Sequence, residues 1–382
     1  MRVAHFLVGR CNPDGSNGVD KSVYHLTSAQ AALGHDVAVF SVSPKPAIPF
    51  PGVDARTYVP ATALDLPSRE LWRSLRAWRP DVVHIHSMYI PANAVIARAL
   101  RRRGIPYVIT PHGAASEYVM RRRPYLKRPY RIFVERPVLN RAAFVHAIAD
   151  QEAIRNYGVT VPVVVAPNGI DMASVPTDLD RRACRSGTVL DGRGRVALFI
   201  GRLDHVRKGL DLLIEAFAEA APRLNELCLV LVGPDHPGSR QFLDDLAARR
   251  GVSSRVVFWG PAFGSDKFKL LAAADFLVHP ARTEAGVPAS VLEALAVGRP
   301  CLVTRPSDPQ AVLARYGAGV IVEPTVSALA RGLQQMAGAD EETLRRQGER
   351  GGMLAREEFS WPRTARSLIE GYARYATRMP AE

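Results

Sequence analysis

The chain alternates between short apolar runs and longer segments in which apolar residues recur every three or four positions. The first apolar run, 2–7, leads into a loop rich in Gly, Asn, Asp and Pro. Segment 19–33 then has helical spacing of its apolar residues, and 36–42 is the next apolar run. Strand, loop, helix and strand in this order predict a parallel sheet covered by helices.

The same alternation continues to residue 172. The proline-rich stretch 44–60 is expected to be a connection without regular structure. We expect strands at 82–86, 107–110, 144–147 and 163–166, and helices at 68–79, 92–103, 125–141 and from residue 150.

A polar stretch, 173–195, interrupts the pattern and is expected to be an interdomain linker. After it a second series begins, with strands at 196–200, 228–232, 256–259, 275–279, 300–304 and 319–322, and helices at 210–221, 239–250, 267–273, 289–297, 328–336 and 341–359. The sequence therefore predicts an α/β protein of two Rossmann-like doubly wound domains, 1–172 and 196–360, followed by a C-terminal helix in 361–382.

Composition narrows the protein class. With 382 residues, of which 47% are hydrophobic, the chain can bury two sizeable cores. Its four cysteines are scattered without a C-x-x-C pair, which argues against a zinc site or disulfide framework and fits a cytoplasmic protein. It contains no run of about 18 apolar residues, so we expect no transmembrane helix.

Charge is distributed unevenly. Residues 1–172 carry a net charge of +10, whereas residues 173–382 carry +3. Segment 91–131 holds ten basic residues and a single acid, Glu117. A basic face of this density attracts phosphates, nucleic acid or an anionic membrane surface.

The richest candidate site follows the strand at 275–279. A Gly286-Val287-Pro288 turn leads into a helix whose start would offer free backbone N–H groups to an anion such as a diphosphate. Glu284 on the loop and Glu293 on the helix could accept hydrogen bonds from hydroxyls. This combination suggests a nucleotide sugar, although an ordinary helix cap with two solvated glutamates fits the same residues.

A second candidate is the loop 201–209, which begins at Gly201 directly after a strand. Arg202 and Lys208 on this loop could neutralise a diphosphate as it becomes a leaving group. A surface loop with two solvated cations is the alternative. The chain has only six lysines, so composition alone does not account for Lys208.

The first half also places polar residues after its strands, where ligands bind in open parallel sheets. Gly18 follows the first strand, His112 follows 107–110 and Asn168 follows 163–166. We expect the two sheets to face each other by these ends across a cleft. A lone histidine such as His112 is more often structural than functional, and His84 and His86 are assigned to the core.

Several chemistries are excluded by missing motifs. Asp178 and Asp180 match a D-x-D spelling, but they lie in the polar stretch and no metal is assigned to them. There is no G-x-x-x-x-G-K-[ST] loop and no G-x-G-x-x-G after the first strand, which disfavours an NTPase and a dinucleotide-dependent dehydrogenase.

With these residues the chain resembles the retaining, nucleotide-sugar-dependent glycosyltransferases of family four, which have the GT-B fold of two Rossmann domains. The resemblance covers nearly the whole chain. The matching motifs are Gly18-Val19, Asp81–His86, Thr110-Pro-His-Gly113, Pro167–Asp171, Gly201–Asp204 with Lys208-Gly209, Glu284 to Pro300, and Phe359-Ser-Trp361 before the last helix.

The resemblance implies roles for these positions. Arg202 and Lys208 would hold the donor diphosphate, Glu293 the ribose hydroxyls and Glu284 the transferred sugar. His112 would lie by the reacting sugar, Gly18 would let the first loop approach the substrates, and the last helix would return to the first, acceptor-side domain. The donor-binding set is completed by Asn168, Gly201, Gly286 and Val287, and no metal or other cofactor is expected.

One departure concerns the two glutamates. Eight residues separate Glu284 from Glu293, one more than in the family pattern. Either Ala285 is a one-residue insertion and Glu284 still reaches the site, or the sugar contact is altered. We favour the insertion. The spacing between Arg202 and Lys208 is also one residue longer than the commonest form.

The expected function is transfer of a sugar from a UDP- or GDP-sugar to a hydroxyl of a glycan or lipid-linked acceptor, with retention of anomeric configuration, in surface polysaccharide or glycolipid synthesis. The alternatives are a sugar-nucleotide epimerase or a phosphorylase on the same scaffold, or a basic nucleic-acid-binding protein. No lysine lies in a recognisable pyridoxal-phosphate motif, and no nucleic-acid recognition motif is present.

The basic excess of 91–131 predicts contact with an anionic inner membrane face, because each Lys or Arg near such a surface contributes about 1 kcal/mol. A solvated basic face on a soluble enzyme is the alternative. The apolar and aromatic residues among the charges, expected to enter the interface, are Tyr118, Val119, Met120, Tyr125, Leu126, Tyr130 and Phe133.

Overall fold

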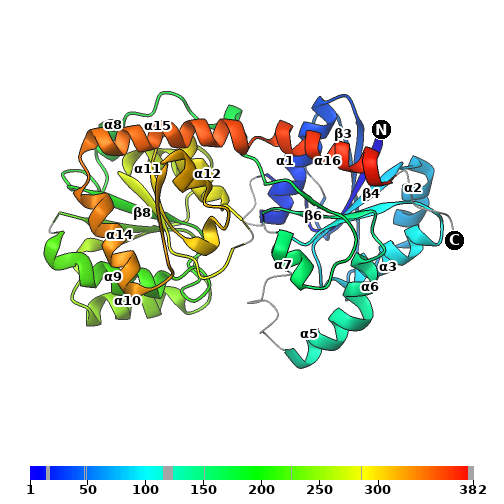
Figure 1. Cartoon of the computed structure of the whole chain (residues 1–382), viewed down its shortest axis with the longest axis horizontal. Helices are drawn as coiled ribbons and strands as arrows, with labels where there is room; N and C mark the ends of the chain where they lie inside the picture. The colour runs from blue at the N-terminus through cyan, green and yellow to red at the C-terminus, as the bar shows by residue number, and fades with distance from the viewer. Residues whose placement is uncertain are drawn as a thin grey trace. The chain divides into compact units, whose positions relative to one another are not determined.

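The computed structural model describes residues 1–13, 18–46, 48, 50–114, 124–149, 151–224, 226–284 and 286–376. It divides into two compact units, each with its own sheet. The first unit combines Met1–Gly169 with Trp361–Glu382, and the second is Ile170–Ser360. The chain therefore leaves the first unit once and returns to it with its last helix, drawn in red in Figure 1.

The first unit contains a seven-stranded sheet in the order β3-β2-β1-β4-β5-β6-β7, and every neighbouring pair is parallel. The order reverses between β1 and β4, which is the topological switch point where ligands bind in such sheets. The strands are β1 Arg2–Val8, β2 Asp36–Val42, β3 Val53–Tyr58, β4 Val82–His86, β5 Tyr107–Thr110, β6 Phe144–Ala147 and β7 Val163–Val165.

Helices cover both faces of this sheet. Helices α2 Arg69–Trp78, α3 Pro91–Arg101 and α6 Arg136–Leu139 pack on one face, where Phe6, Phe40 and Ile85 are fully buried. Helices α1 Gly18–Ala32 and α16 Trp361–Tyr375 cover the other face and lie side by side. The return of α16 therefore completes the apolar cover of the first sheet.

The second unit repeats this architecture with six parallel strands in the order β10-β9-β8-β11-β12-β13. The expected α/β fold of two doubly wound domains is confirmed. The strands are β8 Val196–Ile200, β9 Cys228–Val232, β10 Val256–Gly260, β11 Phe276–His279, β12 Cys301–Thr304 and β13 Gly319–Val322.

The helices of the second unit also divide between two faces. Helices α9 Leu210–Ala220, α10 Ser239–Arg249 and α14 Val326–Gly338 pack around Phe199 and Phe217 on one face. Helices α11 Gly264–Ala273, α12 Ala289–Ala296 and α15 Glu341–Glu358 cover the other. The short helices are α7 Gln151–Asn156, α8 Arg181–Arg185 and α13 Val312–Tyr316.

Two predictions about connections were wrong. The stretch 44–60 contains an edge strand, β3, and the prolines of the stretch lie before and after the strand rather than within it. The stretch 173–195 is not a free linker but part of the second unit, because Leu190 is fully buried there and Arg185 of α8 pairs with Asp275 at 2.8 Å. The boundary between the units lies at 169–170 rather than at 172–173.

The helix expected at 125–141 runs continuously from Pro124 to Leu139, through α5 Pro124–Tyr130, a π-helical turn at Arg131–Glu135, and α6. Pro129 lacks an N–H to donate, and the ring of Pro137 would clash with a carbonyl one turn earlier in a regular α-helix. The wider turn, in which Arg136 N–H bonds to Arg131 O, accommodates this sequence.

No helix among the residues that the structure describes is long and apolar enough to cross a membrane.

Candidate active site

The loop between β8 and α9 is held in one conformation by its backbone. Leu203 N–H donates to Pro234 O, and Arg207 N–H donates to the Asp204 carboxylate. Gly209 then caps α9 with φ 66°, and an added Cβ would lie 2.1 Å from Pro280 O. Only glycine combines this left-handed conformation with so close an approach, so the loop packs directly on the end of β11.

Arg282 fastens the loop after β11 to the same place. Its guanidinium makes two hydrogen bonds to the Asp211 carboxylate, at 2.7 and 2.8 Å, and a third to Val206 O. Paired bonds of this kind fix the geometry as well as adding energy. The two loops singled out in the sequence are therefore joined at the carboxyl ends of neighbouring strands.

Glu284 is the centre of the polar cluster formed there. Its Oε1 accepts hydrogen bonds from Lys208 Nζ and, at 3.1 Å, from His279 Nε2. Burial alone would raise the pKa of Glu284, but the Lys208 charge and the His279 hydrogen bond outweigh it and lower the pKa to about 2. The carboxylate therefore stays ionised and can accept hydrogen bonds, but it is a poor general base.

Arg202 lies on the same loop with an exposed side chain. Its guanidinium has no hydrogen-bond or ion-pair partner within the described part of the chain, whereas Lys208 is already paired with Glu284. A cation that is not committed to a protein carboxylate remains available to an anionic ligand.

The start of α12 has the conformation that its sequence predicts. Gly286 has φ 150°, and Pro288 is the N-cap of the helix. The N–H groups of Val291 and Leu292 bond to Pro288 O. The first two N–H groups of the helix, those of Ala289 and Ser290, have no helical acceptor. They supply the partial positive charge expected at a helix start.

Glu293 lies on α12 and pairs with Lys267 of α11, with Nζ and Oε1 2.6 Å apart. Both side chains are largely buried, with relative exposures of 14% and 18%. A carboxylate held in this way keeps its orientation, so Glu293 can accept hydroxyl hydrogen bonds with its remaining lone pairs.

In the first unit, Gly18 opens α1, Asn168 follows β7 and His112 follows β5. The two residues before Asn168 are fixed, because Ala166 O accepts from His146 at 2.7 Å and Pro167 O accepts from Thr364 of α16 at 2.5 Å. Asn168 itself is half exposed.

His112 sits on the turn after β5 with φ 49°, a left-handed conformation uncommon for residues other than glycine. Its Nε2 lies 3.0 Å from His86 Nδ1, and burial lowers its pKa to about 3. His112 is therefore a neutral hydrogen-bonding group.

Sequence reasoning missed two residues of the second-unit cluster, His279 and Lys267. His279 ends β11 and touches Glu284, and burial lowers its pKa, so its uncharged ring donates to the carboxylate. A polar residue at the end of an otherwise apolar strand was the available signal for His279. Lys267 is one of only six lysines, but its pairing depends on how α11 packs beside α12.

The predicted residues thus form two groups. Gly201, Arg202, Lys208, Glu284, Gly286, Val287 and Glu293 belong to the second unit, while Gly18, His112 and Asn168 belong to the first. Within each unit they lie at the carboxyl ends of strands or on the helices that follow them. Ala285, the proposed insertion, falls outside the described residues.

Two family models match the chain, one on each unit. Residues 16–174 match Glycosyltransferase Family 4, and residues 194–338 match Glycosyl transferases group 1. D-inositol 3-phosphate glycosyltransferases are similar over most of their length. The protein of Frankia alni is 28% identical, with 94% of each chain covered, and that of Actinosynnema mirum is 28% identical, with 94% of this chain and 92% of its own covered.

Solved structures share the fold. Sucrose-phosphate synthase from Thermosynechococcus elongatus superimposes with a TM-score of 0.82 at 22% identity, covering 99% of this chain and 100% of its own. HepE from Anabaena, in complex with UDP and glucose, gives 0.76 at 19% identity, covering 98% and 100%. With both units matched by family models, both sheets doubly wound and the loop motifs in place, the chain belongs to glycosyltransferase family 4 and has the GT-B fold.

Proposed function

We propose that this glycosyltransferase takes its sugar from a nucleoside-diphosphate donor bound to the second unit. The observation that carries the proposal is the cluster in which Lys208 and His279 hold an ionised Glu284, with Arg202, exposed and unpaired with any residue that the structure describes, on the loop of Lys208. Arg202 and the start of α12 supply positive charge for a diphosphate, and the carboxylates of Glu284 and Glu293 accept hydroxyl hydrogen bonds.

UDP-glucose is the first donor to test, since the HepE structures contain UDP and UDP-glucose. Arg202 and Lys208 would stabilise the charge that develops on the departing diphosphate, so no metal is needed for that role in this proposal. In the first unit, His112 would hydrogen-bond a hydroxyl of the reacting sugar, and Gly18 and Asn168 would contact substrate.

We propose that the transfer retains the anomeric configuration, as the family resemblance implies. Glu284 has a pKa lowered to about 2 and is held by Lys208, so it serves better as a hydrogen-bond acceptor than as a nucleophile or base. Front-face transfer, in which the departing phosphate helps to deprotonate the acceptor hydroxyl, then remains as the retaining route.

The donor is tested by measuring hydrolysis across a panel of UDP- and GDP-sugars, with thermal shifts for UDP, GDP and a short oligonucleotide. We expect one nucleotide series to be hydrolysed and to stabilise the protein. Stabilisation by the oligonucleotide alone, without hydrolysis of any nucleotide sugar, would contradict the proposal.

We further propose that the acceptor is a lipid-linked glycan that the enzyme meets at an anionic membrane surface. In the segment from α5 to α6, Tyr125, Ile132 and Phe133 are 71%, 48% and 73% exposed, and Arg128 is exposed among them. Exposed aromatic residues beside cations are typical of surfaces that lie in a membrane interface. Tyr118, Val119, Met120 and Arg121–Arg123, and the side chain of Leu126, fall outside the described residues.

Sedimentation with liposomes tests this surface. Binding to anionic but not neutral vesicles at low salt is expected, and Phe133→Ser with Tyr125→Ser should weaken it, whereas Phe263→Ser, at an exposed phenylalanine of the second unit, should not. Equal absence of binding to both vesicle types, together with rapid transfer to a soluble phosphorylated acceptor such as inositol 3-phosphate, would replace the lipid-linked acceptor by a soluble one.

A further inference from the structure

Five histidines lie on the face of the first sheet that α1 and α16 cover. Strand register aligns them: His5 of β1 lies opposite His84 of β4, and His86 lies opposite Thr110 of β5. His146 of β6 and His112, on the turn after β5, continue the group. Buried polar groups are costly unless they are hydrogen-bonded, so each ring nitrogen here has to be accounted for.

The first half of the network runs from β7 to α16. His146 Nε2 is 2.7 Å from Ala166 O, and His146 Nδ1 is 2.7 Å from Thr110 Oγ1. Thr110 Oγ1 is 2.5 Å from His84 Nε2, and His84 Nδ1 is 2.6 Å from the Tyr372 hydroxyl.

The second half runs from α16 back to the turn after β5. Gln30 of α1 places Nε2 3.3 Å from the Tyr372 hydroxyl and Oε1 2.7 Å from His5 Nε2. His5 Nδ1 is 2.9 Å from His86 Nε2, and His86 Nδ1 is 3.0 Å from His112 Nε2. A single chain of hydrogen bonds thus connects Ala166 to His112.

Each of the five imidazole rings in this hydrogen-bond network is neutral. Burial lowers the pKa of His5 and of His146 to about 4 and that of His112 to about 3, and it lowers the pKa of His84 and His86 as well. A neutral imidazole has one N–H and one lone pair, so each ring must donate on one side and accept on the other.

The donor and acceptor at each hydrogen bond follow from the carbonyl at one end of the network, Ala166 O. Ala166 O has no hydrogen, so His146 Nε2 donates to it, and His146 Nδ1 accepts from the Thr110 hydroxyl. Thr110 then accepts from His84 Nε2–H, His84 Nδ1 accepts from Tyr372 O–H, and the Tyr372 oxygen accepts from the Gln30 amide.

The Gln30 oxygen therefore faces His5 and accepts from His5 Nε2–H. His86 donates to His5 Nδ1, and His112 donates its Nε2–H to His86. Both proton positions on His112 are now fixed: Nε2 carries the hydrogen and Nδ1 carries a lone pair. Within the described residues, His112 Nδ1 has no hydrogen-bond partner.

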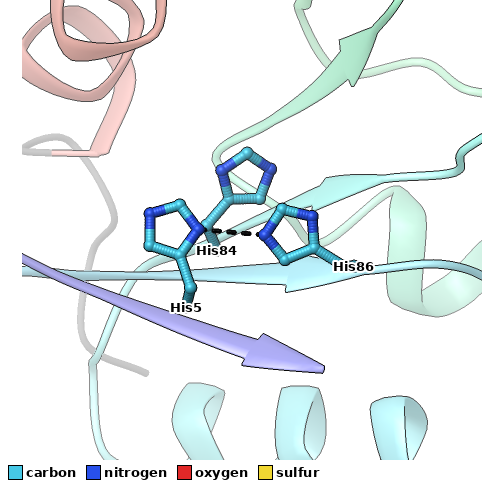
Figure 2. A group of neighbouring side chains, drawn as sticks. All are labelled: His5, His84 and His86. Atoms are coloured by element: carbon cyan, nitrogen blue, oxygen red, sulfur yellow. Dashed lines mark hydrogen bonds between the residues drawn. The ribbon is translucent and has the colours of Figure 1, made fainter. Parts of the chain in front are cut away.

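A buried metal site is the alternative use of these histidines, since ligand atoms of His5, His84 and His86 lie within 4.8 Å of one another. Figure 2 shows His5 and His86 joined by their own hydrogen bond, and the rings of His84 and His86 stack at 4.5 Å with an angle of 18° between their planes. All six ring nitrogens already have partners in the chain, so the hydrogen-bond network accounts for the group better than a metal does.

We propose that this chain fixes the tautomer of His112, so that its unprotonated Nδ1 accepts a hydrogen bond from a hydroxyl of the reacting sugar. The inference deepens the proposed function and rests on it for the ligand. Thr110, Tyr372 and Gln30 are then positioning residues, which act through the rings between them rather than by touching substrate.

If one hydrogen bond of this network is removed, the donor-to-acceptor order of the remaining bonds should no longer be fixed. Without the Thr110 hydroxyl, His84 can donate from Nδ1 to Tyr372, the Gln30 amide can turn over, and His5 and His86 can exchange tautomers. His112 Nε2 would then accept a hydrogen bond from His86 Nδ1–H, and the His112 hydrogen would lie on Nδ1, where it would meet the sugar hydroxyl as a donor instead of an acceptor.

The tautomer is tested directly on the ligand-free protein by nitrogen NMR of histidine-labelled samples, with the His112 signals assigned by their loss in His112→Asn. We expect an unprotonated Nδ1 in the wild type and in Thr110→Ser, and a protonated fraction in Thr110→Val and Tyr372→Phe. Tyr375→Phe is the matched control, because Tyr375 lies on the same helix and its hydroxyl has no partner among the described residues.

Two outcomes overturn the proposal: a protonated Nδ1 in the wild type, or the same tautomer in wild type, Thr110→Val and Tyr372→Phe. Zinc chloride that shifts the signals of His5, His84 and His86 together would assign them to a metal site instead. None of these measurements depends on sugar transfer, so they remain decisive if the proposed function fails.

The contact itself is tested with monofluoro analogues of the donor that is hydrolysed fastest. Fluorine cannot donate a hydrogen bond, so one analogue should lose about tenfold in kcat/KM with the wild type, a loss that His112→Ala and Thr110→Val no longer show. Losses that are the same in all three proteins would show that His112 Nδ1 accepts no hydroxyl.

Discussion

Gly209 lies against the carbonyl of Pro280 so closely that a Cβ would stand 2.1 Å from the oxygen. This contact sets the loop of Lys208 on the end of the strand that leads to Glu284. The ion pair between those two side chains therefore depends on a glycine that touches neither of them.

Gly209→Ala tests this dependence. We expect the free energy of unfolding to fall by roughly 3 kcal/mol or more, because the substitution adds a collision to the left-handed strain. Gly238→Ala is the matched control: Gly238 has φ 79° at the start of α10 but open space around its Cβ, so strain alone should cost about 1 kcal/mol. Equal losses in urea unfolding would show that the contact with Pro280 is unimportant.

Arg202→Ala and Lys208→Ala should each slow donor hydrolysis at least tenfold, about 1.4 kcal/mol of transition-state stabilisation, if they bind the diphosphate. Arg331→Ala on the exposed side of α14 and Lys269→Ala on α11 remove the same charges elsewhere in the unit and should have little effect. Near-normal rates for the first pair, with an intact fold by circular dichroism, would exclude the diphosphate assignment.

Glu284→Gln should lower kcat for transfer by at least about tenfold while changing the affinity for free UDP or GDP much less, because the proposed contact is to the sugar. Deletion of Ala285 restores the shorter spacing to Glu293 and should leave substantial activity if that residue is an insertion. A folded but inactive deletion variant would show that the site is built around the longer loop.

Acid should destabilise the first unit steeply. The unfolded chain takes up protons on its histidines near pH 6.5, whereas His5 and His146 resist protonation in the folded state until about pH 4. Their contribution is therefore fully present above pH 6.5 and is lost as the pH falls towards 4. Between about pH 7.5 and about pH 5.5 each such histidine should cost roughly 1 kcal/mol of unfolding free energy. Urea unfolding that is independent of pH over this range would contradict the neutral assignment.

Both sheets could be predicted because their strands are continuous apolar runs separated by regular intervals. Strand β5 and strand β8, for example, occupy the residues predicted for them. Strand β3 escaped detection because an edge strand needs only one buried face, and its Asp54 and Arg56 alternate with half-buried residues. The π-helical turn at Arg131–Glu135 depends on where two prolines fall in the helix, which periodicity does not register.

The candidate site could be predicted only in part, because some of its contacts depend on how helices and strands pack. The sequence places Lys208 and Glu284 on loops after strands, and parallel topology brings those loops together. Lys267 reaches Glu293 through the packing of two helices, which no local pattern encodes. The histidine chain required the register of β1, β4, β5 and β6, together with the docking of a tyrosine 288 positions away from His84.

The return of α16 to the first unit also has a consequence for synthesis. Trp361, Leu368 and Tyr372 cover Val3 and Val108, so this face of the first sheet lacks part of its apolar cover until residues 361–375 have been made. A nascent chain that ends before Trp361 exposes that face and leaves His84 without the Tyr372 hydroxyl. The unit that contains β1 is thus completed only after the whole of the second unit has been made.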